Sequence, residues 1–208
     1  MSFFITLEGP EGGGKTIQAV KLAEHLRAMG HDVLLTREPG GTSIGDQIRR
    51  VLGALDNTSM RPGTEFLLFS ASRAQHVDEL IRPHLERGGV VVCDRFCDSS
   101  LAYQGYGHRL DLEALRQITR FATGGLTPDL TLLLDLEAEL GLRRRRKDGN
   151  WNRLDSYELE FHRRVRSGYL ELAAAEPQRW VVIDATPPAE TVQREIEGVV
   201  EGRLSQSR

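Results

Sequence analysis

Five short apolar runs set the strongest limit on how this chain can fold. The runs are FFITLE at 3–8, DVLLT at 32–36, VVVCD at 90–94, LTLLLDL at 130–136 and WVVID at 180–184. Each is rich in leucine or β-branched residues and is nearly continuous rather than alternating in polarity. A strand of this kind needs cover on both faces, which is typical of a parallel sheet packed between helices.

Helical patterns fill the segments between these runs. The predicted helices cover 15–29, 44–55, 65–85, 111–121, 137–146, 155–175 and 189–204. Gly30 suits a C-terminal cap and Asp111 an N-terminal cap. Strand and helix therefore alternate, which predicts an α/β fold: a doubly wound five-stranded parallel sheet flanked by helices. Such sheets bind ligands at the carboxyl ends of the strands, here in the loops after the first three.

Length, charge and cysteine content narrow the class of protein. The 208 residues, 39% of them hydrophobic, predict one domain over 1–208, and the net charge of -3 argues against stable nucleic-acid binding. Cys93 and Cys97 are too few for a disulfide framework or a four-cysteine zinc site. No uncharged run approaches the roughly 20 residues that span a bilayer. We therefore expect a cytoplasmic protein with no membrane segment.

The glycine-rich segment GPEGGGKT at 9–16 directly follows the first predicted strand and opens the first predicted helix. Gly9-x-x-x-x-Gly14-Lys15-Thr16 matches the phosphate-binding P-loop, whose backbone N–H groups point inward at phosphate oxygens. Lys15 is expected to reach the β- and γ-phosphates and the Thr16 hydroxyl to hold Mg²⁺. A turn that binds nothing would not need the strand before it and the helix after it. The predicted ATP contacts are Gly9, Pro10, Glu11, Gly12, Gly13, Gly14, Lys15 and Thr16.

The P-loop alone leaves the reaction open, because switch GTPases and small-molecule kinases both begin this way. A guanine-reading switch would be expected to carry an Asn-Lys-x-Asp segment and an Asp-x-x-Gly segment. The chain has three asparagines, none followed by lysine, and no Asp-x-x-Gly. The switch hypothesis therefore lacks its two diagnostic parts.

The third predicted strand ends in Asp94-Arg95, beside the P-loop. An aspartate closing this strand occupies the position that holds the metal or its waters in P-loop enzymes, so Thr16 and Asp94 are the predicted metal ligands. The planar fork of Arg95 suits a second phosphate, which a kinase with a phosphorylated acceptor needs. A plain surface arginine is the alternative interpretation.

Two further segments reach the same edge of the sheet. Strand two runs into the turn REPGGT at 37–42, and Phe69 and Arg73 share one face of the third predicted helix. Phe69 could stack on a base while Arg73 donates to its edge. From spacing alone, a core phenylalanine and a surface-reaching arginine remain the commoner interpretation.

Six motifs in order identify a resemblance over about residues 3 to 200. They are EGPEGGGKT, TREPGGT, FLLFSASRAQH, DRFCDSSLAYQG, PDLTLLLDL and RLDSYELEFHRRVRSGY. With these motifs the chain resembles the thymidylate kinase family, P-loop nucleoside monophosphate kinases that make dTDP from dTMP and ATP. The resemblance implies a five-stranded parallel sheet of the P-loop NTPase type and a homodimer.

The resemblance also implies roles for individual residues. Glu11 would lie near the acceptor sugar and metal, Phe69 would stack on thymine, and Arg73 would bond the base edge. Arg95 would hold the dTMP phosphate, while Ser100 and Gln104 help to read the base and Tyr103 packs on the deoxyribose. The predicted dTMP contacts are Glu11, Arg37, Pro39, Phe69, Arg73, Arg95, Ser100, Tyr103 and Gln104.

A basic run, RRRRK at 143–147, leads toward Arg153 and predicts a lid at about 143–155. Gly12 stands where one subgroup of the family carries a P-loop arginine, and bacterial-type members supply that charge from a mobile lid. Four consecutive arginines cannot share a helix face, so we expect one or two to face the triphosphate. Arg153, which matches the lid motif, is the best single choice. A solvated helix end or a nucleic-acid contact is the alternative.

The predicted reaction is in-line phosphoryl transfer from ATP to dTMP. Lys15, Mg²⁺ and a lid arginine neutralise the γ-phosphoryl group, and Arg95 holds the acceptor phosphate, so the predicted catalytic residues are Lys15, Arg95 and Arg153. A kinase for another nucleoside monophosphate is the nearest alternative. A nucleotide-dependent switch or a DNA-associated ATPase is the alternative outside that class.

Overall fold

A five-stranded sheet forms the middle layer of the computed structural model, which describes residues 2–147, 149 and 151–206. The strands are β1 (Phe3–Glu8), β2 (Val33–Arg37), β3 (Val90–Asp94), β4 (Leu130–Asp135) and β5 (Trp180–Asp184). They lie in the order β2-β3-β1-β4-β5, and every neighbouring pair is parallel. The predicted fold class is confirmed, and each strand lies within one residue of its predicted bounds.

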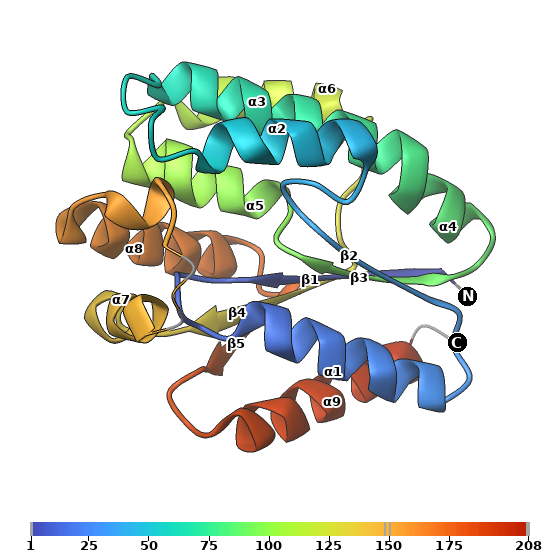
Figure 1. The fold of residues 1–208 in the computed structure, drawn as a ribbon. Helices are drawn as coiled ribbons and strands as arrows, with labels where there is room; N and C mark the ends of the chain where they lie inside the picture. The colour runs from blue at the N-terminus through green and yellow to red at the C-terminus, as the bar shows by residue number, and fades with distance from the viewer. Residues whose placement is uncertain (1, 148, 150, 207–208) are drawn as a thin grey trace.

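Helices cover both faces of this sheet (Figure 1). α1 (Lys15–Ala28) and α9 (Ala189–Gln206) lie against one face. The opposite face carries α2 (Ser43–Gly53), α3 (Pro62–His76), α4 (Arg82–Glu86), α5 (Cys97–Ser100), α6 (Leu112–Thr123) and α8 (Leu159–Ala175). α7 (Ala138–Lys147) follows β4. The sheet therefore has the cover on both sides that its continuous apolar strands require.

Side chains of β1 pack against the helices on both faces of the sheet. Ile5 and Leu7 belong to the core that includes Leu22 of α1 and other side chains of α1 and α9. Phe4 points the other way and meets Phe96 edge-on, with 5.0 Å between ring centroids. This alternation also directs Glu8, the last residue of β1, toward the α5 side of the sheet, where its hydrogen-bond partners lie.

The segment after β3 corrects the sequence-based prediction of a loop there. It is helical, with α5 followed directly by a π-helical segment at Leu101–Gly107. The Glu8 carboxylate accepts hydrogen bonds from the backbone N–H groups of Phe96 (2.7 Å) and Ser99 (3.3 Å). A carboxylate is a strong stabiliser of a helix N-terminus. Here it comes from a distant strand, so the local sequence contains no cap that would predict the helix.

Two predicted helices also have different bounds. The helix expected at 65–85 begins at Pro62, a residue suited to a first turn, and passes through a π-helical segment at Val77–Ile81 before α4. The helix expected at 155–175 begins at Leu159 instead. A 3₁₀ turn at Leu154–Ser156 precedes it, and Tyr157 and Glu158 have extended backbones.

Candidate active site

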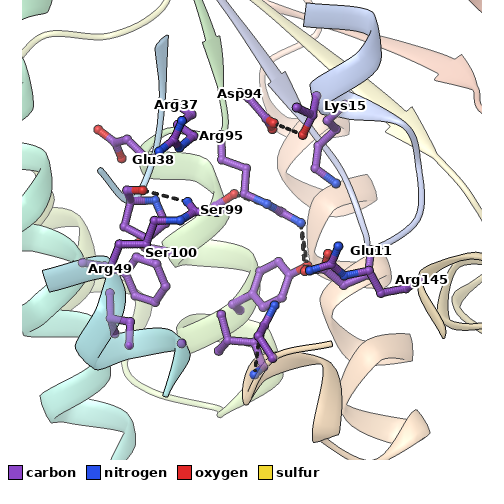
Figure 2. Close-up of a pocket in the computed structure, with 18 of the residues that line it drawn as sticks. Glu11, Lys15, Arg37, Glu38, Arg49, Asp94, Arg95, Ser99, Ser100 and Arg145 are labelled. Atoms are coloured by element: carbon purple, nitrogen blue, oxygen red, sulfur yellow. Dashed lines mark hydrogen bonds and ion pairs between the residues drawn. The ribbon is translucent and has the colours of Figure 1, made fainter. Parts of the chain in front are cut away.

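A cavity of about 680 Å³ opens at the carboxyl ends of β1, β2 and β3. The predicted site residues that line it are Glu11, Gly12, Gly14, Lys15, Thr16, Arg37, Pro39, Phe69, Asp94, Arg95, Ser100, Tyr103 and Gln104. Figure 2 shows Arg95 in the middle, with Lys15 and Asp94 toward one end and Arg49 and Ser100 toward the other. One cavity thus joins the P-loop to most of the predicted acceptor residues.

The P-loop backbone follows the conformation that its glycines allow. Gly9 has φ 138° and Gly12 has φ 72°, and a Cβ on Gly9 would lie only 2.5 Å from the backbone oxygen of Leu134. Gly14 then precedes α1, which begins at Lys15. The loop therefore packs tightly against β4, while Gly12 and Gly14 line the cavity.

Lys15 and Thr16 have partners within the protein. Lys15 is buried and its Nζ donates to the backbone oxygen of Pro10 at 2.7 Å. Burial lowers the pKa of Lys15 to about 8, against the opposing effect of nearby carboxylates. The Thr16 hydroxyl donates to Asp94 Oδ2 at 2.5 Å. The two predicted metal ligands are thus adjacent, although they lie on different elements.

Arg95 is held on several sides. Its backbone is left-handed, with φ 70°, and its N–H donates to the backbone oxygen of Leu7 at 3.0 Å. The guanidinium donates to five oxygens at 2.9–3.2 Å, those of the Gly9 backbone, Glu11, Ser99, Tyr103 and Tyr169. The alternative of a plain surface arginine is therefore wrong.

Glu11 carries the negative charge next to Arg95. Although burial opposes ionisation, the charges of Arg95 and Lys15 lower the pKa of Glu11 to about 2. Tyr103 also donates to Glu11 Oε1, at 2.8 Å. Glu11 is therefore ionised at neutral pH and holds Arg95 and Tyr103 together.

The far end of the cavity holds Phe69 and, behind Ser100, Arg73. Phe69 is half-buried and lines the cavity, so it is not a core phenylalanine. Arg73 is 1% exposed, which contradicts the surface-reaching alternative. Its Nε donates to Glu38 at 2.8 Å and its NH2 to Ser100 Oγ at 3.1 Å.

Two buried polar atoms on the predicted base contacts have no hydrogen-bond partner in the described part of the chain. They are NH1 of Arg73, a donor, and Oε1 of Gln104, an acceptor. Gln104 Nε2 donates to Glu65 at 2.7 Å, which turns the amide oxygen the other way. Buried polar groups are normally paired, so this end suits a ligand that offers one acceptor and one donor.

The arginines of the basic run on α7 have different surroundings. Arg145 lines the cavity and donates to both oxygens of Asp155, at 3.2 Å each. Arg144 instead donates to the backbone of Ala185 and Thr186, and Arg146 lies over the ring of Trp151. Residues 148 and 150 of the predicted lid lie outside the described part of the chain.

Arg153, predicted to be the lid arginine, does not line the cavity. It is buried, and its guanidinium donates to Glu65 Oε2 at 2.5 Å, the Tyr157 hydroxyl at 2.6 Å and the Leu52 backbone oxygen at 3.0 Å. The buried carboxylate of Glu65, on α3, pairs with the charge of Arg153. No feature of the lid sequence predicts this partner. Arg145 is the arginine of this region that faces the cavity.

Sequence reasoning missed several residues of the site. Ser99 and Arg49 line the cavity, and Tyr169 contacts Arg95 from α8. Ser99 lies in the motif DRFCDSSLAYQG and Tyr169 in RLDSYELEFHRRVRSGY, so both motifs could have predicted these site residues. Arg49 lies on α2, where its NH1 donates to the Pro39 backbone oxygen at 2.8 Å, and no motif marks it.

Comparison with known proteins supplies the family. The thymidylate kinase family model matches residues 7–196. The chain belongs to the thymidylate kinase family. The family and the enzyme class predicted from the sequence, an ATP-dependent nucleoside monophosphate kinase, are both confirmed, and a nucleotide-dependent switch is not favoured.

Individual relatives are similar to this chain over nearly their whole length. A thymidylate kinase of Deinococcus radiodurans is 57% identical, over 96% of this chain and 97% of the relative. One from Roseiflexus sp. is 54% identical, over 99% and 96%. The solved structure of thymidylate kinase from Ehrlichia chaffeensis superposes with a TM-score of 0.80 at 33% identity and covers 96% of this chain and 98% of that one.

Proposed function

We propose that this enzyme transfers the γ-phosphoryl group of ATP to dTMP, giving dTDP and ADP for DNA precursor synthesis, in the cavity described above. The observation that carries this assignment is the position of Arg95, which donates both to the backbone of the P-loop and to Glu11. A phosphate held by Arg95 would therefore lie next to the end of a triphosphate cradled by the P-loop.

The P-loop end would hold ATP. The backbone N–H groups of residues 9–16 and the N-terminus of α1 favour phosphate oxygens. Lys15 would leave the Pro10 oxygen and donate to the β- and γ-phosphates. Its charge would then stabilise the negative charge on the transferring group.

Thr16 and Asp94 would hold Mg²⁺. They offer one hydroxyl and one carboxylate oxygen only 2.5 Å apart, which fits an ion that takes a few protein oxygens together with phosphate oxygens and water. The described residues contain no group of three or more His, Cys, Asp or Glu side chains placed to hold a metal by themselves. Bound Mg²⁺ would neutralise charge on the triphosphate.

Arg95 would hold the phosphate of dTMP, and Arg37 and Arg49 would add positive charge. All three line the cavity between the P-loop and Phe69. A phosphate monoester is already anionic near neutral pH, so the acceptor needs orientation rather than a strong base. Tyr103, whose ring lines the cavity beside Arg95, would pack against the deoxyribose.

The base would occupy the end formed by Phe69, Arg73, Ser100 and Gln104. Phe69 would stack on thymine, Arg73 NH1 would donate to O4, and Gln104 Oε1 would accept from N3–H. Cytosine presents a donor and an acceptor at these positions, so dCMP would leave both protein atoms unpaired. This complementarity favours dTMP over other monophosphates.

The segment at 143–155 would act as a lid within a single domain. Arg145 would supply the positive charge that the P-loop lacks at Gly12. Closure would bring this charge to the transferring group and exclude water that would otherwise hydrolyse ATP.

We further propose a cytoplasmic homodimer that makes no stable complex with nucleic acid. α3 and α6 carry exposed Leu67, Ile118 and Phe121, the last 89% exposed. A second copy of the chain would cover this apolar surface. In the described part of the chain no helix has both the length and the apolar character needed to cross a bilayer. Sedimentation of wild type and Phe121→Asp would test the dimer.

A coupled assay tests the reaction itself. ADP formation would be measured with ATP and Mg²⁺ in the presence of dTMP, dCMP, dUMP or no acceptor. The proposal expects dTMP to raise the rate far above basal hydrolysis and above the rate with dCMP. Equal rates with and without dTMP would contradict it.

A further inference from the structure

Glu65 lies at the base end of the cavity with its carboxylate fully buried. Its Oε1 accepts from Gln104 Nε2 at 2.7 Å, and its Oε2 accepts from Arg153 at 2.5 Å and from the Tyr157 hydroxyl at 2.9 Å. His108 Nε2 lies 3.4 Å from Oε1. Although burial opposes ionisation, the hydrogen bonds from these side chains lower the pKa of Glu65 to about 2. At neutral pH this carboxylate can therefore only accept.

This fixed acceptor decides which way the Gln104 amide faces. An amide has a donor end and an acceptor end of nearly equal size, and a half-turn exchanges them. Because Glu65 accepts, the NH₂ group of Gln104 must face it, and Oε1 must face away. Gln104 lines the cavity, and Oε1 is the buried atom with no partner among the described residues.

We propose that Glu65 is a specificity-determining residue of this enzyme, which positions Gln104 so that an acceptor faces N3 of the pyrimidine. Thymine carries a hydrogen on N3, whereas cytosine has a lone pair there. The Gln104 oxygen facing the lone pair on N3 of cytosine would reject that base, whereas the NH₂ group of a reversed amide would donate to the lone pair. Glu65 acts through Gln104 and does not touch the base. The inference rests on the proposed base site.

Arg153 and Tyr157 determine which way an amide at position 65 would face. Both donate to Oε2, on the side of Glu65 away from Gln104. In Glu65→Gln, the oxygen of the new amide is expected to remain with these two donors. Its NH₂ group then faces Gln104, which must turn over to accept from it. The NH₂ group of Gln104 would then face the cavity and suit N3 of cytosine.

The test is the ratio of kcat/KM for dTMP to kcat/KM for dCMP, measured in wild type and Glu65→Gln. The ratio is expected to fall by about 10-fold or more, with a rise in the value for dCMP itself. A purely structural role would lower both values together and leave the ratio unchanged. An unchanged ratio in a folded variant overturns the inference, whether or not the overall activity falls.

Glu79→Gln is a matched control. Glu79 Oε2 accepts from Gln75 Nε2 at 2.7 Å, the same pair of groups at the same distance, but Glu79 is exposed and does not line the cavity. The ratio should equal that of wild type. A fall as large as in Glu65→Gln would show that lost charge alone changes selectivity, which also overturns the inference.

A second variant keeps the test decisive if Glu65→Gln does not fold with Arg153 left unpaired. The double variant Glu65→Gln/Arg153→Gln leaves neither charge buried alone, and the same fall in the ratio is expected. Failure of the wild type to phosphorylate dTMP would instead overturn the proposed function, so the two failures are distinguishable.

Discussion

The two ends of the cavity differ in how their polar groups are paired. At the P-loop end, the groups expected to meet phosphate or metal already have hydrogen-bond partners within the protein. Lys15 donates to the Pro10 oxygen, and Thr16 donates to Asp94. At the base end, Arg73 and Gln104 are fixed by Glu38 and Glu65 and still present one unpaired atom each. Phosphate binding must therefore exchange existing bonds, whereas base binding completes an arrangement that is already in place.

This difference indicates separate tasks for the two ends. A preformed end selects its ligand strictly, because the wrong edge leaves buried atoms unpaired at a cost of about 1–3 kcal/mol each. An end whose hydrogen bonds rearrange can direct its positive charge at the negative charge that develops on the transferring phosphoryl group. Changes at the P-loop end should therefore lower kcat, and changes at the base end should alter the choice of substrate.

Lys15→Met is expected to have the largest effect. The variant keeps the stem but deletes the charge aimed at the β- and γ-phosphates, so kcat should fall by about 10²-fold or more with the fold intact. The ratio of kcat/KM for dTMP to that for dCMP should stay close to wild type. Steady-state rates together with a thermal melt measure both. Near-normal phosphoryl transfer would contradict the P-loop assignment.

Arg73→Ala should reduce the selectivity of the base end for dTMP. Loss of the donor to O4 is expected to lower kcat/KM for dTMP by about 10²-fold and that for dCMP much less, so selectivity falls. Glu38 also loses a buried partner, although His76 remains beside it, so a thermal melt should accompany the kinetics. If the dTMP to dCMP ratio survives, selection lies with other residues.

Arg145→Ala tests the lid. Because Arg145 faces the cavity and Arg153 is bound to Glu65, kcat should fall by about 10-fold in Arg145→Ala, with little change in the KM for dTMP. Arg146→Ala, which removes a neighbouring exposed arginine, is the control and should behave as wild type. A change confined to the KM for dTMP would place Arg145 in the acceptor site instead.

Tyr103 stands between the two ends, and two variants separate its ring from its hydroxyl. Tyr103→Ala should raise activity on the ribose analogue of dTMP by a few-fold, up to about 10-fold, because the ring no longer crowds the sugar. Tyr103→Phe should disturb the contacts with Glu11 and Arg95 without opening that space. An unchanged preference for deoxyribose in the alanine variant would disprove this role.

Glu8 is buried and accepts from Ser99, and a change at Glu8 should alter stability rather than selectivity. Burial, assisted by the charge of Asp98, raises the pKa of Glu8 from 4.5 to about 7. The folded protein then binds more protons than the unfolded chain between about pH 4.5 and 7, so this group lowers the free energy of unfolding as the pH rises through that window. Urea unfolding should show this loss in wild type and not in Glu8→Gln. Parallel pH profiles would argue against the raised pKa.

Much of this arrangement could be predicted from local sequence. The strands, the P-loop and the edge where Asp94 and Arg95 lie follow from apolar runs and glycine spacing, because neighbouring residues determine those features. The helix at 97–107 and the partner of Arg153 could not be predicted in this way. Each depends on one buried carboxylate, Glu8 or Glu65, that reaches across more than 80 residues of chain.

The left-handed backbone of Arg95 sets stability against the proposed activity at one residue. A left-handed conformation costs a non-glycine residue about 1 kcal/mol or more, which glycine would largely avoid. Glycine at this position would relax the turn after β3 and remove the guanidinium that joins the two halves of the cavity. The fold therefore tolerates a strained backbone at the point where the proposed reaction uses a long side chain, and a glycine that relieved the strain would remove that side chain.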